Sequence, residues 1–205
     1  LAYLVKGNSR IMGFFRTAFY MPVVMSAVVV GMIWTNLLDS AGLVNSVLKA
    51  LKIISKPIPF LTDRWGVLFS SMFVTIWLGL GYYMVIYLTA LANIDESLYE
   101  AASLDGAGPV RQFIYVTMPG VRSTMMLIMM LSTIAAFRVF NEIYVLTNGS
   151  AGPGGMDMTM SMLIKREGTG IQARTGYASA ISIVVLVIVG VMLIVQQILQ
   201  KRGED

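Results

Sequence analysis

Two charged side chains, Arg138 and Glu142, interrupt a run that is otherwise uncharged from residue 123 to residue 147. They are four residues apart, so a helix would place both on one face. Ionisable groups within a membrane-spanning segment are rare and usually face water or the protein interior. Two interpretations follow: the side chains line a path across the membrane, or they pair with each other near the outer end of the run.

Methionines at alternate positions form a second pattern with possible chemistry, namely Met156, Met158, Met160 and Met162. Thioethers at this spacing can bind a soft metal such as copper(I). The chain has 16 methionines, however, and methionine is a common filler of apolar gaps. We therefore expect these side chains to pack against other residues, and we predict no metal site.

The chain lacks most of the residue types and motifs that catalytic sites use. The chain has no cysteine and no histidine, which excludes thiolate chemistry, disulfides and histidine-ligated metals. No paired carboxylates lie within the apolar runs, and no phosphate-binding loop of the form GxxxxGKS or GxxxxGKT occurs. We therefore predict no catalytic residue and no cofactor bound by this chain.

A third feature is the polar, glycine-punctuated segment YEAASLDGAG at residues 99–108, which lies between two long apolar runs. Ser97 and Glu100 have the spacing of a helix-capping box. Asp105 and Gly106 can end this helix, because glycine readily adopts a positive φ. The segment therefore predicts a short polar helix.

A second short helix is predicted directly after the first. Pro109 suits the first turn of a helix, where its missing N–H costs little, and Pro119 would close that helix. Such a pair of helices is too polar to enter lipid and too regular for a linker. We interpret residues 93–122 as a helix-turn-helix that docks another protein.

The elements that position these residues are long apolar runs, since 57% of the 205 residues are apolar and 13% are charged. This composition is typical of membrane proteins. Residues 17–38, 66–94 and 175–200 carry no charge, and each run could cross a hydrocarbon core of about 30 Å as a helix. Residues 123–147 form a fourth run. None alternates as barrel strands do, so we predict an all-α, polytopic membrane helical bundle with about four spanning helices.

The boundaries follow from proline and polar residues. We expect the first span over about residues 14–38, with Pro22 near its start, and the second to end at about residue 92. Residues 39–65 contain KPIP and four basic residues, which predicts a hairpin or a short surface helix followed by a turn. Residues 148–174, with NGSAGPGG, predict a loop.

Charge does not orient the chain, because seven Lys and Arg residues fall on each side of the predicted spans. The net charge of +4 is scattered, so nucleic acid is not expected as a partner. No internal repeat is present, and we predict one domain over residues 1–205. The sequence begins without Met at LAYLV, which looks like the tail of an earlier helix, so we expect it to be truncated at its N-terminus.

The sequence EAASLDGAGPVRQFIYVTMP, residues 100–119, resembles the EAA loop of the membrane subunits of binding-protein-dependent ABC importers. That pattern is Glu-Ala-Ala, three residues, Gly, nine residues, then Ile-x-Leu-Pro. The matching positions are Glu100, Ala101, Ala102, Gly106 and Pro119. Val116 and Met118 stand where Ile and Leu are usual, and both departures are conservative.

Other stretches resemble the maltose/glycerol-phosphate type of carbohydrate-importer permease: GFFRTAFYMP, GLVN, WLGLGYYM, LYEAASLDGAG, FNEIYVLTNG and GYASAISIVV. The resemblance covers nearly the whole chain, from about residue 13 to residue 202. It implies a type I importer permease that moves a sugar or related solute inward, with one or two further helices at the N-terminus. It also implies a multi-pass location in a bacterial or archaeal inner membrane.

The resemblance further implies a set of partners and a division of labour. These partners are a second homologous permease subunit, two ATPase subunits, an extracytoplasmic solute-binding protein and the lipid bilayer. ATP and Mg²⁺ belong to the ATPase, whose cleft receives the cytoplasmic loop of residues 93–122. ATP-driven closure of the ATPase pair then moves this loop and rocks the two membrane subunits. The implied coupling residues are Glu100, Ala101, Ala102, Asp105, Gly106 and Pro119.

Glu100 has two compatible interpretations: it pairs with a basic group of the ATPase, or it serves the capping box of its own helix. Carried over to this sequence, the solute path of the family comprises Gly79, Tyr82, Phe137, Arg138, Phe140 and Asn141. The aromatic residues in this set could equally be ordinary helix-packing residues. Arg138 stands where the family has a small amide, which leaves the solute open.

Two other classes of protein compete with the importer. A self-sufficient ion-coupled carrier could use Arg138 and Glu142 in its coupling site, but the inverted repeats and broken helix pairs typical of that class are absent from the sequence. An intramembrane enzyme would need a catalytic constellation, and the spans contain none.

Overall fold

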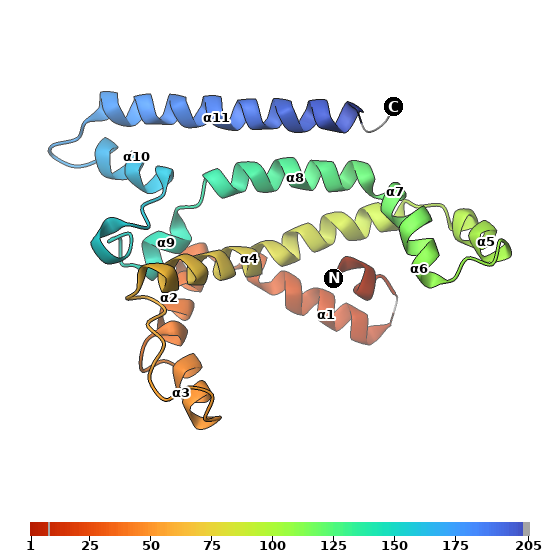
Figure 1. The fold of residues 1–205 in the computed structure, drawn as a ribbon, viewed down its shortest axis with the longest axis horizontal. Coiled ribbons are helices and arrows are strands. Elements are labelled where there is room, and N and C mark those ends of the chain that lie inside the picture. Colours follow the sequence, from red (N-terminus) through yellow and green to blue (C-terminus); the bar gives the residue numbers. More distant parts are fainter. Residues whose placement is uncertain (8, 203–205) are drawn as a thin grey trace. The chain divides into compact units, whose positions relative to one another are not determined.

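The computed structural model describes residues 1–7 and 9–202, so Asn8 and the last three positions of the expected domain 1–205 lie outside the described residues. Within the described residues the chain is helical and has no strand (Figure 1), which confirms the all-α fold. The helices of the first half are η1 (Ala2–Val5), α1 (Arg10–Tyr20), η2 (Met21–Val24), α2 (Ala27–Leu38), α3 (Leu43–Ala50) and α4 (Arg64–Ala92). Those of the second half are α5 (Glu96–Leu104), α6 (Pro109–Gln112), η3 (Phe113–Thr117), α7 (Met118–Gly120), α8 (Arg122–Phe137), α9 (Asn141–Leu146), η4 (Pro153–Gly155), α10 (Met160–Gly168) and α11 (Thr175–Arg202).

Three stretches of the described chain are apolar and long enough to cross a membrane: Ala27–Ala50, Arg64–Ala92 and Thr175–Lys201. A fourth is added if Pro109–Gly120 and Arg122–Phe137, which meet at a bend of 63°, form one span. α4 and α11 agree with the predicted second and last spans. α3 is the short helix expected within residues 39–65, although it lies inside the candidate span Ala27–Ala50.

The first predicted span is not one helix. α1 ends at Tyr20, η2 follows with Pro22 inside it, and α2 begins at Ala27 after an extended Ser26 (φ −61°, ψ 132°). Proline has no N–H to donate and hinders the preceding turn of a helix, so the helix breaks here. Pro22 therefore lies at an interruption of the apolar run and not near the start of a span.

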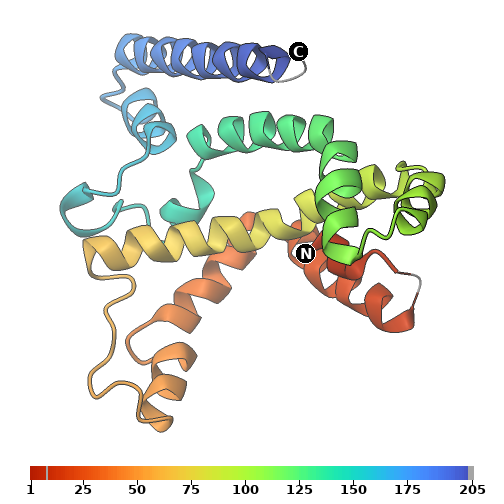
Figure 2. The same ribbon diagram turned by 45° about the vertical axis from the view of Figure 1, so that its right-hand side comes forward.

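The predicted span over residues 123–147 is also interrupted. α8 ends at Phe137, Phe140 has non-helical angles (φ −142°, ψ −59°), and α9 begins at Asn141 (Figure 2). The hydroxyl of Ser161 donates to the carbonyl of Phe137 at 3.2 Å, so a side chain 24 residues away satisfies one carbonyl at the end of the helix. Val139 and Phe140 meanwhile pack against a core cluster that includes Ile143.

This interruption overturns the prediction that Arg138 and Glu142 share one helix face. Arg138 is exposed and lies in the break, whereas Glu142 is half-buried in the first turn of α9. Within the described residues no ion pair joins them. The interpretation of the two charges as a simple helical pair is therefore wrong.

The described residues divide into two compact units. The first unit comprises Leu1–Val24, Gly79–Ser132 and the residues from Gln196 onward, and the second comprises Met25–Leu78 and Thr133–Val195. In the first unit Leu91, Ile94 and Val121 form a core cluster. α4 approaches α1 so closely that a Cβ on Gly81 would meet the carbonyl oxygen of Phe19, which is the close contact that small residues permit.

The second unit contains two core clusters. Val30, Val74 and Leu146 form one, and α2 meets α9 so closely that a Cβ on Gly31 would lie 2.7 Å from the Cβ of Val145. Ile143, Ala151 and Met162 form the other.

The four alternate methionines do not share one environment. Met162 is buried in the second of these clusters and Met158 packs against it, while Met156 and Met160 are exposed. Two of the four therefore pack as expected, and residues 148–174 contain the helix α10 where a loop alone was predicted.

Asn45 holds the loop that follows α3. Its side chain is 0% exposed, its Nδ2 donates to the carbonyls of Asp39 and Ile58 at 3.1 Å each, and its Oδ1 accepts from the Ile58 N–H at 2.8 Å. These three bonds link α3 to the segment that returns to α4.

We expect Asn45→Ala to destabilise the protein by about 2–4 kcal/mol, because it leaves buried backbone groups without partners. Thermal unfolding in detergent, followed by tryptophan fluorescence, measures the change. Asn36→Ala is the matched control, since Asn36 is exposed and its amide bonds only to Met32 of its own helix at 2.8 Å. Equal changes in Tm for the two variants would contradict the role given to Asn45.

Candidate functional site

The helix α5 begins at Glu96, and its N-cap is Asp95. The Asp95 side chain accepts a hydrogen bond from the Ser97 N–H at 2.9 Å, and this bond lowers the pKa of the exposed carboxyl below its ordinary value. The predicted capping box of Ser97 and Glu100 is therefore wrong, because the short carboxylate of Asp95 takes the cap position first.

Glu100 is consequently free of a capping role. It is exposed in the middle of α5, and within the described residues its carboxylate has no ion-pair or hydrogen-bond partner. An exposed carboxylate on a short helix can accept a hydrogen bond from a basic group of another protein.

The predicted helix end at Asp105 and Gly106 is confirmed. Gly106 has φ +73°, its N–H donates to the Ser103 carbonyl at 3.0 Å, and the Ala107 N–H donates to the Ala102 carbonyl at 2.9 Å. These two bonds are those of a Schellman motif. A Cβ on Gly106 would meet nothing within 4 Å, so a larger side chain would not clash with a neighbour. Glycine is favoured here because of the positive φ angle of the backbone.

The second helical segment begins at Pro109 as predicted but does not close at Pro119. η3 is a π-helical turn in which the Met118 N–H donates to the Phe113 carbonyl, and α7 then continues to Gly120. Pro119 occupies the start of α7, where its missing N–H is tolerated after the wider turn. The helix bends at Val121 and continues as α8.

Most of the predicted coupling residues are accessible to a partner. Ala102 is half-buried, and the exposed ones are Glu100, Ala101, Asp105, Gly106 and Pro119. Three apolar side chains of the same segment are also highly exposed: Leu104 (90%), Tyr115 (75%) and Val110 (72%). These three side chains were not among the predicted coupling residues, although an apolar residue directly before Asp105-Gly106 in a polar loop was a usable signal. Where exposed apolar side chains form a contiguous patch rimmed by polar ones, they mark a protein–protein contact site.

The predicted solute-path residues fall into both units. Gly79 and Tyr82 lie on α4 within the first unit. Tyr82 is 46% exposed, and its ring lies edge-on to that of Tyr83 with 5.3 Å between the centroids. The structure brings the other four together at the break after α8, in the second unit: Phe137, Arg138, Phe140 and Asn141. Phe140 stacks on Tyr144 at 5.0 Å, and the Lys165 ammonium lies 4.1 Å from the centroid of the Tyr144 ring.

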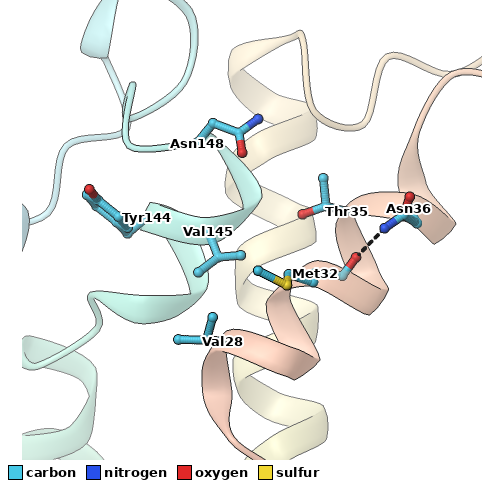
Figure 3. Close-up of a pocket in the computed structure, with 7 residues that line it drawn as sticks. All are labelled: Val28, Met32, Thr35, Asn36, Tyr144, Val145 and Asn148. Carbon is cyan, nitrogen blue, oxygen red and sulfur yellow. Dashed lines mark hydrogen bonds between the residues drawn. The ribbon is translucent and has the colours of Figure 1, made fainter.

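A cavity of about 510 Å³ lies between α2 and α9 in the second unit (Figure 3). It is lined by Val28, Met32, Thr35, Asn36, Tyr144, Val145 and Asn148. Val145 points toward Met32 and Val28, while amides and a hydroxyl occupy the other parts of the wall. A few polar groups on an apolar wall are typical of small-molecule sites, and none of these seven side chains is charged.

Asn148 is the lining residue whose backbone is most constrained. It has φ +49°, which asparagine tolerates better than most residues, and it follows the end of α9. A smaller cavity of about 280 Å³ also includes Tyr144 but is lined by the cations Lys165 and Arg166. None of the six predicted solute-path residues lines either cavity, so neither cavity was predicted from the sequence.

Comparisons with known proteins agree with this architecture. Residues 1–204 match the family described as binding-protein-dependent transport system inner membrane component. The chain is 34% identical over 193 residues to the probable ABC transporter permease protein YurN of Bacillus subtilis, covering 94% of this chain and 65% of that protein. It is 33% identical over 195 residues to the lactose transport system permease protein LacF of Rhizobium radiobacter, covering 95% and 65%.

The fold is also similar to that of a solved structure, a bacterial alginate ABC transporter in complex with an alginate pentasaccharide-bound periplasmic protein. The TM-score is 0.83 and the identity 23%, with 98% of this chain and 69% of that chain covered. The chain spans 65% of the length of the two relatives named above.

Proposed function

Because this chain belongs to the family of binding-protein-dependent transport system inner membrane components, we propose that it is a permease subunit of an ABC importer for a sugar or related solute. The match over residues 1–204 is the observation that carries the proposal. The lactose transport permease among its relatives supports a carbohydrate as the solute. The relatives are ABC permeases, and the alternative of an ion-coupled carrier finds no support.

The assembly that we propose is a multi-pass protein of a bacterial or archaeal inner membrane. The chain forms one permease domain and works with a second homologous permease, two ATPase subunits and an extracytoplasmic solute-binding protein. ATP and Mg²⁺ are held by the ATPase subunits, and this chain binds no cofactor and performs no catalysis.

Residues 93–122 are the proposed cytoplasmic coupling loop. The exposed carboxylate of Glu100 meets a basic group of the ATPase, and Leu104 supplies an apolar contact beside it. Ala101 and Ala102 allow close packing, and Gly106 turns the chain back toward the second helix. In this arrangement a movement of the ATPase is passed to α4 and α8, which flank the loop.

The solute path is proposed to follow the break after α8. Backbone that is not helical at membrane depth occurs where it is buried in protein or lines a water-filled cavity. The break at residues 138–140 therefore supports Phe137, Arg138, Phe140 and Asn141 as path residues. Gly79 and Tyr82, on α4 in the first unit, are proposed as path residues on the family resemblance alone. The cavity between α2 and α9, which none of these residues lines, is proposed as a further part of the path, and its uncharged lining favours a neutral sugar.

Uptake of labelled sugars into liposomes tests this function. The liposomes contain the full-length assembly, and ATP and the binding protein are added. ATP-dependent uptake of at least one sugar supports the proposal. Uptake driven by an ion gradient in the absence of the ATPase would restore the carrier interpretation.

We expect Asn148→Gly to raise the apparent KM for the transported sugar about tenfold, because the substitution removes one good hydrogen bond between the Asn148 side-chain amide and the sugar. Glycine keeps the positive φ, so the backbone at this position is preserved. Thr169→Ala, on the cation-lined cavity, is the matched control and should leave KM unchanged. An unchanged KM for Asn148→Gly would exclude this cavity from the solute path.

A further inference from the structure

Tyr99 connects the two helical segments of the coupling loop. Its hydroxyl lies 2.9 Å from the Thr117 Oγ1, in a hydrogen bond between residues 18 positions apart. Thr117 is 1% exposed and sits in the π-helical turn η3. A buried hydroxyl needs a partner, so this bond fixes where α5 lies against η3.

The ring of Tyr99 has a second role in the first unit. It packs against the core cluster of Leu91, Ile94 and Val121. Leu91 belongs to the last turn of α4, and Val121 directly precedes α8. Tyr99 therefore connects α5 to both long helices that flank the loop, while the next residue, Glu100, is exposed on the same helix.

The segment that precedes α1 also contacts this tyrosine. The Lys6 ammonium lies 4.8 Å from the centroid of the Tyr99 ring, and the ring of Tyr3 meets that of Phe113 edge-on at 5.0 Å. Arg16 of α1 holds the segment in place, because its Nε donates to the Val5 carbonyl at 2.8 Å and its Nη2 donates to the Gly7 carbonyl at 2.6 Å.

A π-helical turn inside a helical segment is rare and is frequent at functional sites. Here the turn η3 lies between α5, the helix proposed to dock the ATPase, and the bend that leads into α8. A displacement of α5 therefore reaches α8 through the Tyr99 contacts more directly than through the chain of residues 105–116.

We propose that Tyr99 is the positioning residue that transmits movement of the ATPase-docked helix α5 to α4 and α8, with Lys6 holding its ring. The inference rests on the proposed importer function. Tyr99 acts through the hydroxyl bond to Thr117 and through its packed ring, and it does not itself dock the ATPase.

The test measures ATP hydrolysed per sugar molecule taken up, in liposomes with the full assembly. Tyr99→Phe keeps the ring and removes the hydroxyl, and we expect it to raise this ratio about fivefold while the ATPase still co-purifies. Thr117→Val should have the same effect, and the double variant should be no worse than either, because both changes remove one bond. Lys6→Met should raise the ratio about twofold.

Tyr20→Phe is the matched control, since this tyrosine lies in α1 of the same unit, outside the coupling loop, and is 40% exposed. An unchanged ratio in Tyr99→Phe would overturn the inference, as would additive effects in the double variant. Loss of the ATPase from Tyr99→Phe would make it a docking residue and would also overturn it. Failure of the proposed function is seen separately, because the native assembly would then show no ATP-driven uptake.

Discussion

Gly106→Pro is expected to abolish ATP-driven uptake while the protein still reaches the membrane. The native residue has φ +73°, whereas proline is fixed near −65° and has no N–H for the bond to the Ser103 carbonyl. The Schellman end of α5 then cannot form, at a cost of about 3 kcal/mol or more. Because Glu100 and Leu104 belong to this helix, the surface that meets the ATPase is displaced.

Uptake and ATP hydrolysis in liposomes measure the effect, with the amount of protein in the membrane as the check on folding. Gly108→Pro is the matched control, because Gly108 already has φ −69° and a Cβ there meets nothing within 4 Å. Gly106→Ala should be milder, since a left-handed residue other than glycine costs about 1–2 kcal/mol. Native uptake by Gly106→Pro would remove the helix end from the coupling mechanism.

The second large effect is expected from Leu104→Asp. Leu104 is 90% exposed, so the substitution removes almost no internal packing and should leave Tm unchanged. In the proposed complex, however, the new carboxylate would be buried against an apolar part of the ATPase without a partner. A loss of about 2 kcal/mol or more, typical of a buried interface anchor, lowers the affinity for the ATPase roughly thirtyfold.

Co-purification of the ATPase with the tagged permease measures this loss. Ile171→Asp is the control, because Ile171 is also fully exposed but lies between α10 and α11 in the second unit. Retention of the ATPase by Leu104→Asp would show that the exposed leucine is not an anchor. Loss of the ATPase from both variants would point instead to a general effect of added negative charge.

Several features of this protein follow from local chemistry and could be predicted from the residues alone. Long uncharged runs determine helices such as α4 and α11, because backbone groups in lipid must be satisfied within the segment. The end of α5 at Gly106 is equally local, since glycine pays no steric cost at a positive φ. Short local motifs, such as the sequence of residues 100–119, also indicated the permease family.

Other features depended on residues far apart in the sequence. The break after Phe137 is stabilised by the hydroxyl of Ser161 and by packing of Val139 and Phe140 on a cluster that includes Met162. The run itself contains neither proline nor glycine at this point, so no local signal separates Arg138 from Glu142.

The sequence by itself thus determined the membrane class, the two uninterrupted spans and the glycine end of the coupling helix, because each depends on length, hydrophobicity or one backbone angle. Only the tertiary structure decided which charges share a face, which tyrosine joins the coupling helices and where a cavity opens beside Asn148. These depend on which side chains meet between α2 and α9 within the second unit, and between α5 and η3 within the first. Such contacts arise from packing between elements that are distant along the chain.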